Sequence, residues 1–441
     1  MKPIRVPTSA KRMMRSVIRS LAAFIATTSV FAFNPLAQTS GGESKKPDQE
    51  AAPFRPELGT FAPLEKAHAF RGELVFVDHV NRRGSLRVTG GSEVFFQHRP
   101  QPFALLPYGV VRFQNAPADL RNIPLGTLLH ASGFLPPDPA NSAVPLVQKP
   151  TIEQPAENHL LLLEDEPSHC IRVGKAWRLK EVDVQKHLTK LVATLEPRET
   201  RDASAPEQTL TLDEGTRIWR GRECLALRDM IANGSWPAEG KRSLDGQRVQ
   251  LGLSWLPAGT WENRVENQFH ITDIWLDDES MQRSSDHQTG LHKSLIRTRL
   301  MPAYVDAVEY GKFGRATATL TLFGGMDSSL YADFKAGEQG VIVSAENTLK
   351  PWSSIVSSSH IGSKGTILSV GKSTRPSSLG NSGIQVRLET DLIIEGIRPG
   401  KIVRIRPASW PHVSAPREEY LMDPRIDSDD RHPSPAIFPK Y

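Results

Sequence analysis

The sequence predicts an all-β protein made of tandem small OB-like β-barrels, in three to four modules with few short helices. Alternating apolar and polar residues dominate the chain, which is typical of half-buried strands. Glycine and proline, 32 and 34 of the 441 residues, interrupt these segments often and mark turns. A glycine, an apolar strand, an aromatic residue and a proline also follow one another three times, in residues 123–137, 244–257 and 397–411. We interpret this recurrence as diverged copies of one small barrel.

Residues 1–37 predict a signal peptide and therefore an exported protein. Six basic residues and no acidic residue occur there, and the basic residues precede an apolar run in residues 21–33. Small residues near Ala32 and Ala37 provide cleavage positions. The apolar run has 13 residues, whereas a membrane-spanning helix needs roughly 20, which disfavours an uncleaved anchor. We expect a periplasmic or extracellular protein with no membrane span after the leader is removed.

The charge of the chain lies mostly in this leader. The whole chain has a net charge of +5 and the leader contributes six positive charges, so the remainder is close to −1. A nucleic-acid binder needs a clustered basic face on the folded domain, and this balance disfavours one. Two local basic groups, in residues 292–299 and 398–406, are interpreted as solvated outer faces of the barrels.

The segments after the leader predict a linker and then two modules. Residues 38–60 predict a flexible linker, because their polar, Gly- and Pro-rich composition has too little apolar content to pack. Residues 61–167 predict the first barrel module, in which the turn at residues 81–84 signals a hairpin. Residues 168–278 predict the second module, which holds six of the eight tryptophans and a short helix at residues 224–232.

The last third of the chain predicts a connector, a third module and a tail. Residues 279–300 are polar and predict the connector. Residues 301–422 predict the third module, as one large barrel or two small ones. Residues 423–441, rich in Asp and Pro, predict a disordered or draped tail.

Cys170 and Cys224 are the only cysteines, and both lie in the second module. In an oxidising compartment the two thiols can form a disulfide. The alternative is two buried thiols. The sequence leaves both open, because it does not show whether the two Cα atoms come within bonding range.

The strand, short helix and strand in residues 209–253 resemble the second half of small secreted bacterial OB-like modules. More broadly, the chain is similar to an uncharacterised family of exported bacterial proteins built from tandem modules of this kind. The resemblance covers most of residues 69–412 and rests on the strand-and-turn pattern. It implies a fold and no particular activity.

Aromatic side chains are the best candidates for binding residues. OB folds hold sugars or bases on stacking platforms, and four tryptophans near strand ends suit that role: Trp219, Trp255, Trp261 and Trp410. The alternative, which we favour, is that these side chains plug the ends of the barrels.

Repeated acids and histidines have a structural interpretation. Asp78, Asp183 and Asp306 each follow a valine near a strand end, where Asp commonly bonds its own turn. His287 and His292 lie five residues apart with Asp286 nearby, and two histidines and an acid can bind zinc, but the spacing matches no zinc motif and we interpret them as exposed connector residues. The sequence has no zinc-protease, CxxC, EF-hand or phosphate-loop motif, and no catalytic residue, metal site or cofactor is predicted.

These features predict a secreted, non-enzymatic binding or structural protein of the bacterial envelope or exterior. Its expected partner is an envelope protein or a glycan. Two alternatives stay open at this point: an OB-type binder of glycan or nucleic acid, and an exported hydrolase with a site between modules.

Overall fold

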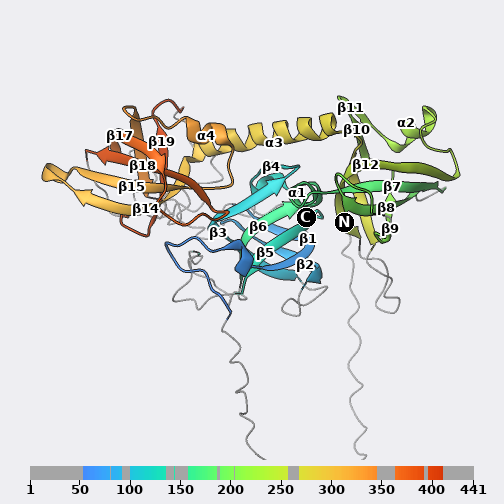
Figure 1. The fold of residues 1–441 in the computed structure, drawn as a ribbon, viewed down its shortest axis with the longest axis horizontal. Helices are drawn as coiled ribbons and strands as arrows, with labels where there is room; N and C mark the ends of the chain where they lie inside the picture. The colour runs from blue at the N-terminus through green and yellow to red at the C-terminus, as the bar shows by residue number, and fades with distance from the viewer. Residues whose placement is uncertain are drawn as a thin grey trace, which may run out of the picture. The chain divides into compact units, whose positions relative to one another are not determined.

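The computed structural model describes residues 53–79, 81–91, 100–135, 144, 157–185, 189–202, 204–256, 268–344, 363–391 and 396–410. The predictions for the leader, the tail and Trp261 lie outside these residues. The described chain is mostly β-strand and forms three barrels in chain order, which confirms the predicted all-β fold of tandem barrels (Figure 1).

The first barrel is a ring of five strands in the order β1–β2–β3–β6–β5, which closes back on β1. Its strands are β1 (His68–Asp78), β2 (Arg83–Gly91), β3 (Pro100–Phe113), β5 (Leu128–Phe134) and β6 (Asn158–Asp165). β3 and β6 are parallel and the other neighbours are antiparallel, as in an OB-type barrel. The short β4 (Ala116–Pro117) extends β3.

The second barrel repeats this order with β7, β8, β9, β13 and β12. Its strands are β7 (Lys175–Val184), β8 (Thr189–Pro197), β9 (Glu207–Leu212), β12 (Gly240–Leu256) and β13 (Gln268–Trp275). Three short elements lie between β9 and β12: β10 (Arg217–Arg220), β11 (Glu223–Leu225) and α2 (Leu227–Ala232). β9 and β13 are parallel where they meet, at the pair Thr211 and His270.

The third barrel is a single closed ring of six strands in the order β14–β15–β18–β17–β16–β19. Its elements are β14 (Met301–Tyr310), β15 (Ala316–Phe323), α4 (Ser328–Ala332), β16 (Gln339–Ser344), β17 (Ser363–Lys372), β18 (Asn381–Thr390) and β19 (Ile402–Pro407). Every neighbouring pair is antiparallel, so its order differs from that of the two OB-like rings. Alternation in the sequence predicts strands but does not specify their partners.

All three barrels have an irregularity in their first strand. The register shifts at residues 74–76 of β1, 179–181 of β7 and 305–307 of β14. Such bulges bend a strand and increase its twist, which helps a small sheet to close. Asp306 is itself the bulged residue, whereas Asp78 and Asp183 lie beyond the bulge of their own strands. The three aspartates are therefore not equivalent.

The contacts of the aspartates differ accordingly. Asp78 accepts hydrogen bonds from the backbone and side-chain nitrogens of Asn81, at 3.1 and 2.7 Å, as the turn interpretation predicts. Asp306 bonds to no turn of its own. It pairs with Arg375 and accepts hydrogen bonds from Thr321 and Gln385 at 2.7 and 2.9 Å. The turn interpretation is therefore wrong for Asp306.

The polar segment predicted as a connector is a helix of 22 residues, α3 (Asp278–Arg299). The Asp277 side chain caps its first turn by accepting from the Ser280 amide at 2.7 Å. Acidic residues in the first turn and arginines in the last turn interact favourably with the helix dipole. Its buried stripe is largely polar: Ser280, Met281, Ser285, Gln288, His292 and Ile296. Apolar periodicity does not signal such a helix.

α3 contacts all three barrels along its length. Asp277, its N-cap, accepts from the Gly221 amide of the second barrel at 2.9 Å. Ser285 donates to the Asn115 carbonyl of the first barrel at 3.2 Å, and Arg297 pairs with Asp333 of the third at 3.0 Å. In the described part of the chain, no helix has both the length and the apolar character to cross a membrane.

The buried side chains form one core in each barrel and a fourth cluster shared by the first and third. In the shared cluster, Phe61 contacts Tyr108 and Tyr304 at ring distances of 5.0 and 5.2 Å. The preceding residues 53–60, which the sequence predicts as part of a flexible linker, also contact the barrels. The Phe54 ring contacts Phe134 at 5.4 Å, and Arg375 donates to the Gly59 carbonyl.

The first and second barrels are joined by α1 (Glu166–Arg172), where Glu166 is buried. One carboxylate oxygen of Glu166 lies 2.6 Å from His130 Nε2. The other accepts from Trp177 Nε1 at 3.0 Å and from the Cys170 thiol at 3.3 Å. Burial alone would raise the pKa of Glu166, but the hydrogen bond and charge of His130 outweigh it and lower the pKa to about 2.

Both cysteines are free in the structure, Cys170 buried and Cys224 exposed. The two thiols are therefore not joined in a disulfide, and the expectation of two buried thiols is right for Cys170 and wrong for Cys224. Burial and the neighbouring Glu166 raise the pKa of Cys170 well above its ordinary value. A thiol held protonated in this way is a poor nucleophile and contributes to the packing of the junction.

Candidate functional site

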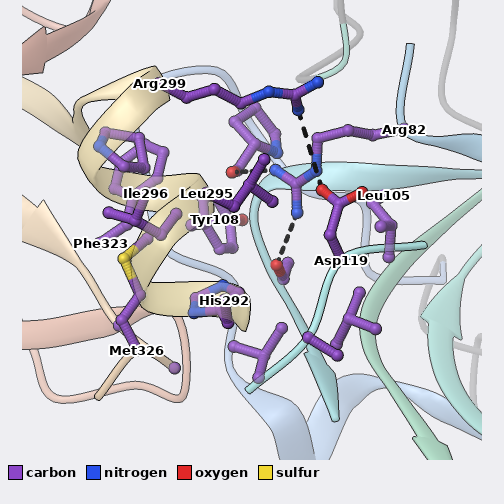
Figure 2. A pocket seen from close by; sticks show the side chains of 18 of the residues that line it. Arg82, Leu105, Tyr108, Asp119, His292, Leu295, Ile296, Arg299, Phe323 and Met326 are labelled. Atoms are coloured by element: carbon purple, nitrogen blue, oxygen red, sulfur yellow. Dashed lines mark hydrogen bonds and ion pairs between the residues drawn. The ribbon is translucent and has the colours of Figure 1, made fainter. Parts of the chain in front are cut away.

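A cavity of about 150 Å³ lies where the first barrel, the C-terminal half of α3 and the third barrel meet (Figure 2). The first barrel supplies the β1–β2 turn, the middle of β3 and the segment before the short 3₁₀ turn at Leu120–Asn122. α3 supplies residues 292, 295, 296 and 299. The third barrel supplies the end of β15 with the glycines that follow it, and β19. Segments more than 200 residues apart therefore share one site.

Arg82 provides a partly buried cation on the first-barrel side. Its backbone adopts a left-handed conformation, φ 56°, in the β1–β2 turn, which is uncommon for a residue with a side chain. Its guanidinium donates to the carbonyls of Pro107 and Gly109 at 2.6 and 2.8 Å. Burial lowers the pKa of Arg82; Asp119 opposes this and Arg299 adds to it. The turn therefore holds a guanidinium at the cavity in an environment that disfavours its charge.

Asp119 is the only acidic residue among the described residues that line the cavity. It lies 3.2 Å from Arg121 Nε and 3.8 Å from Arg299 Nη1. Burial alone would raise its pKa, but Arg299 and Arg121 outweigh burial and lower it. Asp119 is thus ionised and shared between cations. Four arginines also line the cavity: Arg82, Arg83, Arg299 and Arg404. Arg83 pairs with Glu157 at 3.0 Å, and Arg404 donates to the Arg299 carbonyl at 3.0 Å.

His292 projects from α3 toward the same space, and only 6% of it is exposed to solvent (Figure 2). Its Nδ1 has no hydrogen-bond partner among the described residues. Burial lowers the pKa of His292 to about 4, an effect that Asp119 opposes and Arg82 reinforces. The imidazole is neutral at pH 7 and has a polar atom to offer a ligand.

The opposite side of the cavity is apolar. Tyr108, Leu295, Ile296, Phe323 and Met326 line it (Figure 2). The Tyr108 hydroxyl already accepts from the Ala62 amide at 2.9 Å, and burial raises its pKa to about 12. Tyr108 therefore offers its ring rather than an acidic proton.

The size and lining together limit what the cavity can hold. A cavity of about 150 Å³ accommodates a molecule roughly the size of benzene. The charged side chains of Arg82, Asp119 and Arg299 converge at one end of it, and most of the large apolar side chains line the rest. No cluster of three or more His, Cys, Asp or Glu residues suited to a metal ion occurs in the ranges that the structure describes.

The tryptophans predicted as binding residues do not gather at this cavity. Trp219 is half-buried and donates to Asp273 at 2.8 Å. Trp255 is buried, and the Arg87 guanidinium lies 4.5 Å from the centre of its ring. Trp410 is buried against Phe334 and donates to Asp333, which is the arrangement of a barrel plug. These three described tryptophans form no exposed row.

Sequence reasoning missed the residues that the cavity uses. His292 was interpreted as exposed, but it lies on the buried stripe of α3 with Gln288 and Ile296. Residues 281, 285, 288, 292 and 296 fall on one helical face, but only the first and the last of them are apolar, so the sequence does not mark this face as buried. Nothing in the sequence distinguishes Arg82 or Asp119 from other charged turn residues.

The buried histidine predicts a stability that depends on pH. In the unfolded chain His292 takes up a proton near pH 6.5, but in the folded protein only near pH 4. The contribution of neutral His292 to the free energy of unfolding is therefore complete above pH 6.5. It is lost as the pH decreases toward 4, by up to about 3 kcal/mol. His292→Leu should remove this part of the pH dependence in urea unfolding series. His287 is exposed on the same helix, so His287→Leu should show the same pH dependence of the free energy of unfolding as the wild type. An equal pH dependence in the two variants would contradict the assignment of this effect to His292.

Comparison with protein-family models, curated proteins and solved structures finds no match to this chain. The expected family of exported bacterial proteins is therefore unsupported.

Proposed function

We propose that this protein binds a small organic or inorganic anion in the cavity between its first and third barrels, as a non-enzymatic binding protein. The observation that carries the proposal is the pair Arg82 and His292 in the cavity lining: His292 Nδ1 is buried with no hydrogen-bond partner among the described residues, and the Arg82 guanidinium is bonded to two carbonyl oxygens. An anion in the cavity balances the charge of Arg82, which burial disfavours. The predicted export stays part of the proposal and places this binding in the envelope or outside the cell.

Two groups are available to hold the anion. The hydrogen bonds of Arg82 within the described chain use two of its five N–H donors. His292 Nδ1, which is buried, is the second group. Hydrogen bonds to charged groups contribute about 1.5–3 kcal/mol each. A ligand of so few atoms is expected to bind with a Kd on the order of micromolar to millimolar.

The two alternative functions have less support from the geometry. An OB-type glycan or nucleic-acid binder would use an exposed aromatic row, but Trp255 and Trp410 are buried. A hydrolase of the Ser or Cys type needs a nucleophile beside its histidine. The described lining of the cavity contains no serine, threonine or cysteine near His292.

The test is calorimetric titration and thermal unfolding of the full chain with phosphate, sulfate, acetate and benzoate. At least one anion should raise the Tm and bind with one site per chain. His292→Leu should weaken that binding at least tenfold, whereas the matched exposed variant His287→Leu should leave it unchanged. The leucine also removes a buried polar atom without a partner, so this variant should fold. Failure of all four anions at millimolar concentration, or equal binding by both variants, would overturn the proposal.

A further inference from the structure

The cavity has two chemically different walls. Arg82, Asp119 and Arg299 form a charged wall on one side, and their side chains converge in Figure 2. The rings and aliphatic chains of Tyr108, Ile296 and Phe323 form the other. A ligand that fills the space must therefore have one charged end and one apolar end.

The apolar wall is not an open surface. Phe323 is 1% exposed and packs edge-on against Tyr304 and Phe61 at ring distances of 5.0 and 5.9 Å. Tyr108 is equally buried, and its hydroxyl is occupied by the Ala62 amide. Neither ring can turn toward water without disrupting the shared cluster. This wall offers a ligand apolar contact and no hydrogen bonds from these two rings.

Tetrahedral oxyanions fit such a space poorly. Phosphate and sulfate carry oxygens in all directions, and those that face an apolar wall lose hydrogen bonds to water without replacement, at a cost of about 1–3 kcal/mol for each such group. A carboxylate carries both oxygens at one end. One oxygen can accept from Arg82 and the other from His292 in the tautomer that carries its proton on Nδ1, while the rest of the molecule contacts the apolar wall.

We infer that the ligand is a small amphipathic monocarboxylate, with a ring or a branched aliphatic body of about four to six carbon atoms. This inference rests on the proposed function, because it names the class of anion that the same cavity takes. The volume of about 150 Å³ agrees with a benzene-sized body. Burying such a body contributes about 25 cal/mol per Å² of apolar surface, which distinguishes it from acetate.

The experiment compares ligands that each lack one feature, by calorimetric titration of the full chain. Benzoate and isovalerate have both charge and body, acetate lacks the body, benzamide lacks the charge, and phosphate is a tetrahedral oxyanion. We expect benzoate or isovalerate to bind at least 30-fold tighter than acetate and phosphate, and at least tenfold tighter than benzamide. Acetate or phosphate binding as tightly as the larger acids would overturn this inference and leave the proposed function standing. Absence of binding by every anion would overturn both.

Met326→Gln tests the apolar wall itself. Met326 lines the cavity and is only partly buried, so a polar side chain of similar shape should be tolerated in the fold. The substitution should raise the Kd for benzoate at least fivefold and change the Kd for acetate less than twofold, because acetate does not reach the wall. His292→Leu should weaken both acids. An equal loss of both acids in Met326→Gln would contradict the two-wall geometry, and an unchanged Tm would show that the fold is intact.

Discussion

Replacing Glu166 by alanine should lower the free energy of unfolding by about 3–5 kcal/mol, because it removes one member of a buried charged network. His130, Trp177 and Cys170 all bond to this carboxylate at the junction of the first two barrels. Without it, these polar groups lose their partner inside the protein, and a cavity opens beside them. Each buried group left without a partner costs about 1–3 kcal/mol.

Urea unfolding monitored by tryptophan fluorescence measures this effect. Glu199→Ala is the control, because the Glu199 side chain is 85% exposed and its removal should cost less than 0.5 kcal/mol. The folded pKa of Glu166 is lowered to about 2 from an ordinary 4.5. The stability that it contributes is therefore present above pH 4.5 and lost as pH falls through 2. The free energies of unfolding of the wild type and Glu166→Ala should therefore approach each other in acid. A loss below 1 kcal/mol at pH 7 would show that the network is not important for stability.

Gly365→Ala should destabilise the third barrel by about 3 kcal/mol or more, although it adds a single methyl group. Gly365 lies in β17 opposite Thr390 of β18. A Cβ at this position would overlap the Glu389 carbonyl oxygen, which is backbone held in the same ladder. The two strands must separate locally to accommodate it, and a closed barrel has no free edge to absorb that movement.

The same strand contains a matched control. Gly371 is also in β17 and exposed, and a Cβ there would meet nothing within 4 Å. Gly371→Ala should be neutral or stabilising by about 0.4–1 kcal/mol, because it restricts the unfolded chain. Thermal unfolding of both variants separates the two cases. Equal Tm values would mean that β17 and β18 are less closely paired than the structure shows.

Much of the architecture follows from local sequence. Alternation of apolar and polar residues marks strands because side chains point to opposite faces of a sheet, and it identified strands in all three barrels. The recurring pattern before residues 137, 257 and 411 correctly indicated several small barrels in one chain. The polar stripe of α3, in contrast, has no apolar period, so the segment was predicted as a polar connector and its 22-residue helix was not predicted.

Other features depend on long-range contacts. The order of strands in the third barrel is one of them, since β16 pairs with β17 and β19 rather than with β15, the strand before it. The cavity is another, because Arg82, Asp119 and His292 come from three separate segments. The burial of His292 and the shared charge of Asp119 arise only when these segments meet, because burial and charge pairing depend on distance in space. The sequence by itself determined most of the strands and the presence of three or four small barrels. The tertiary structure alone decided that there are three, how the strands of the third are ordered, and where the site lies, because strand pairing and burial depend on contacts between distant segments.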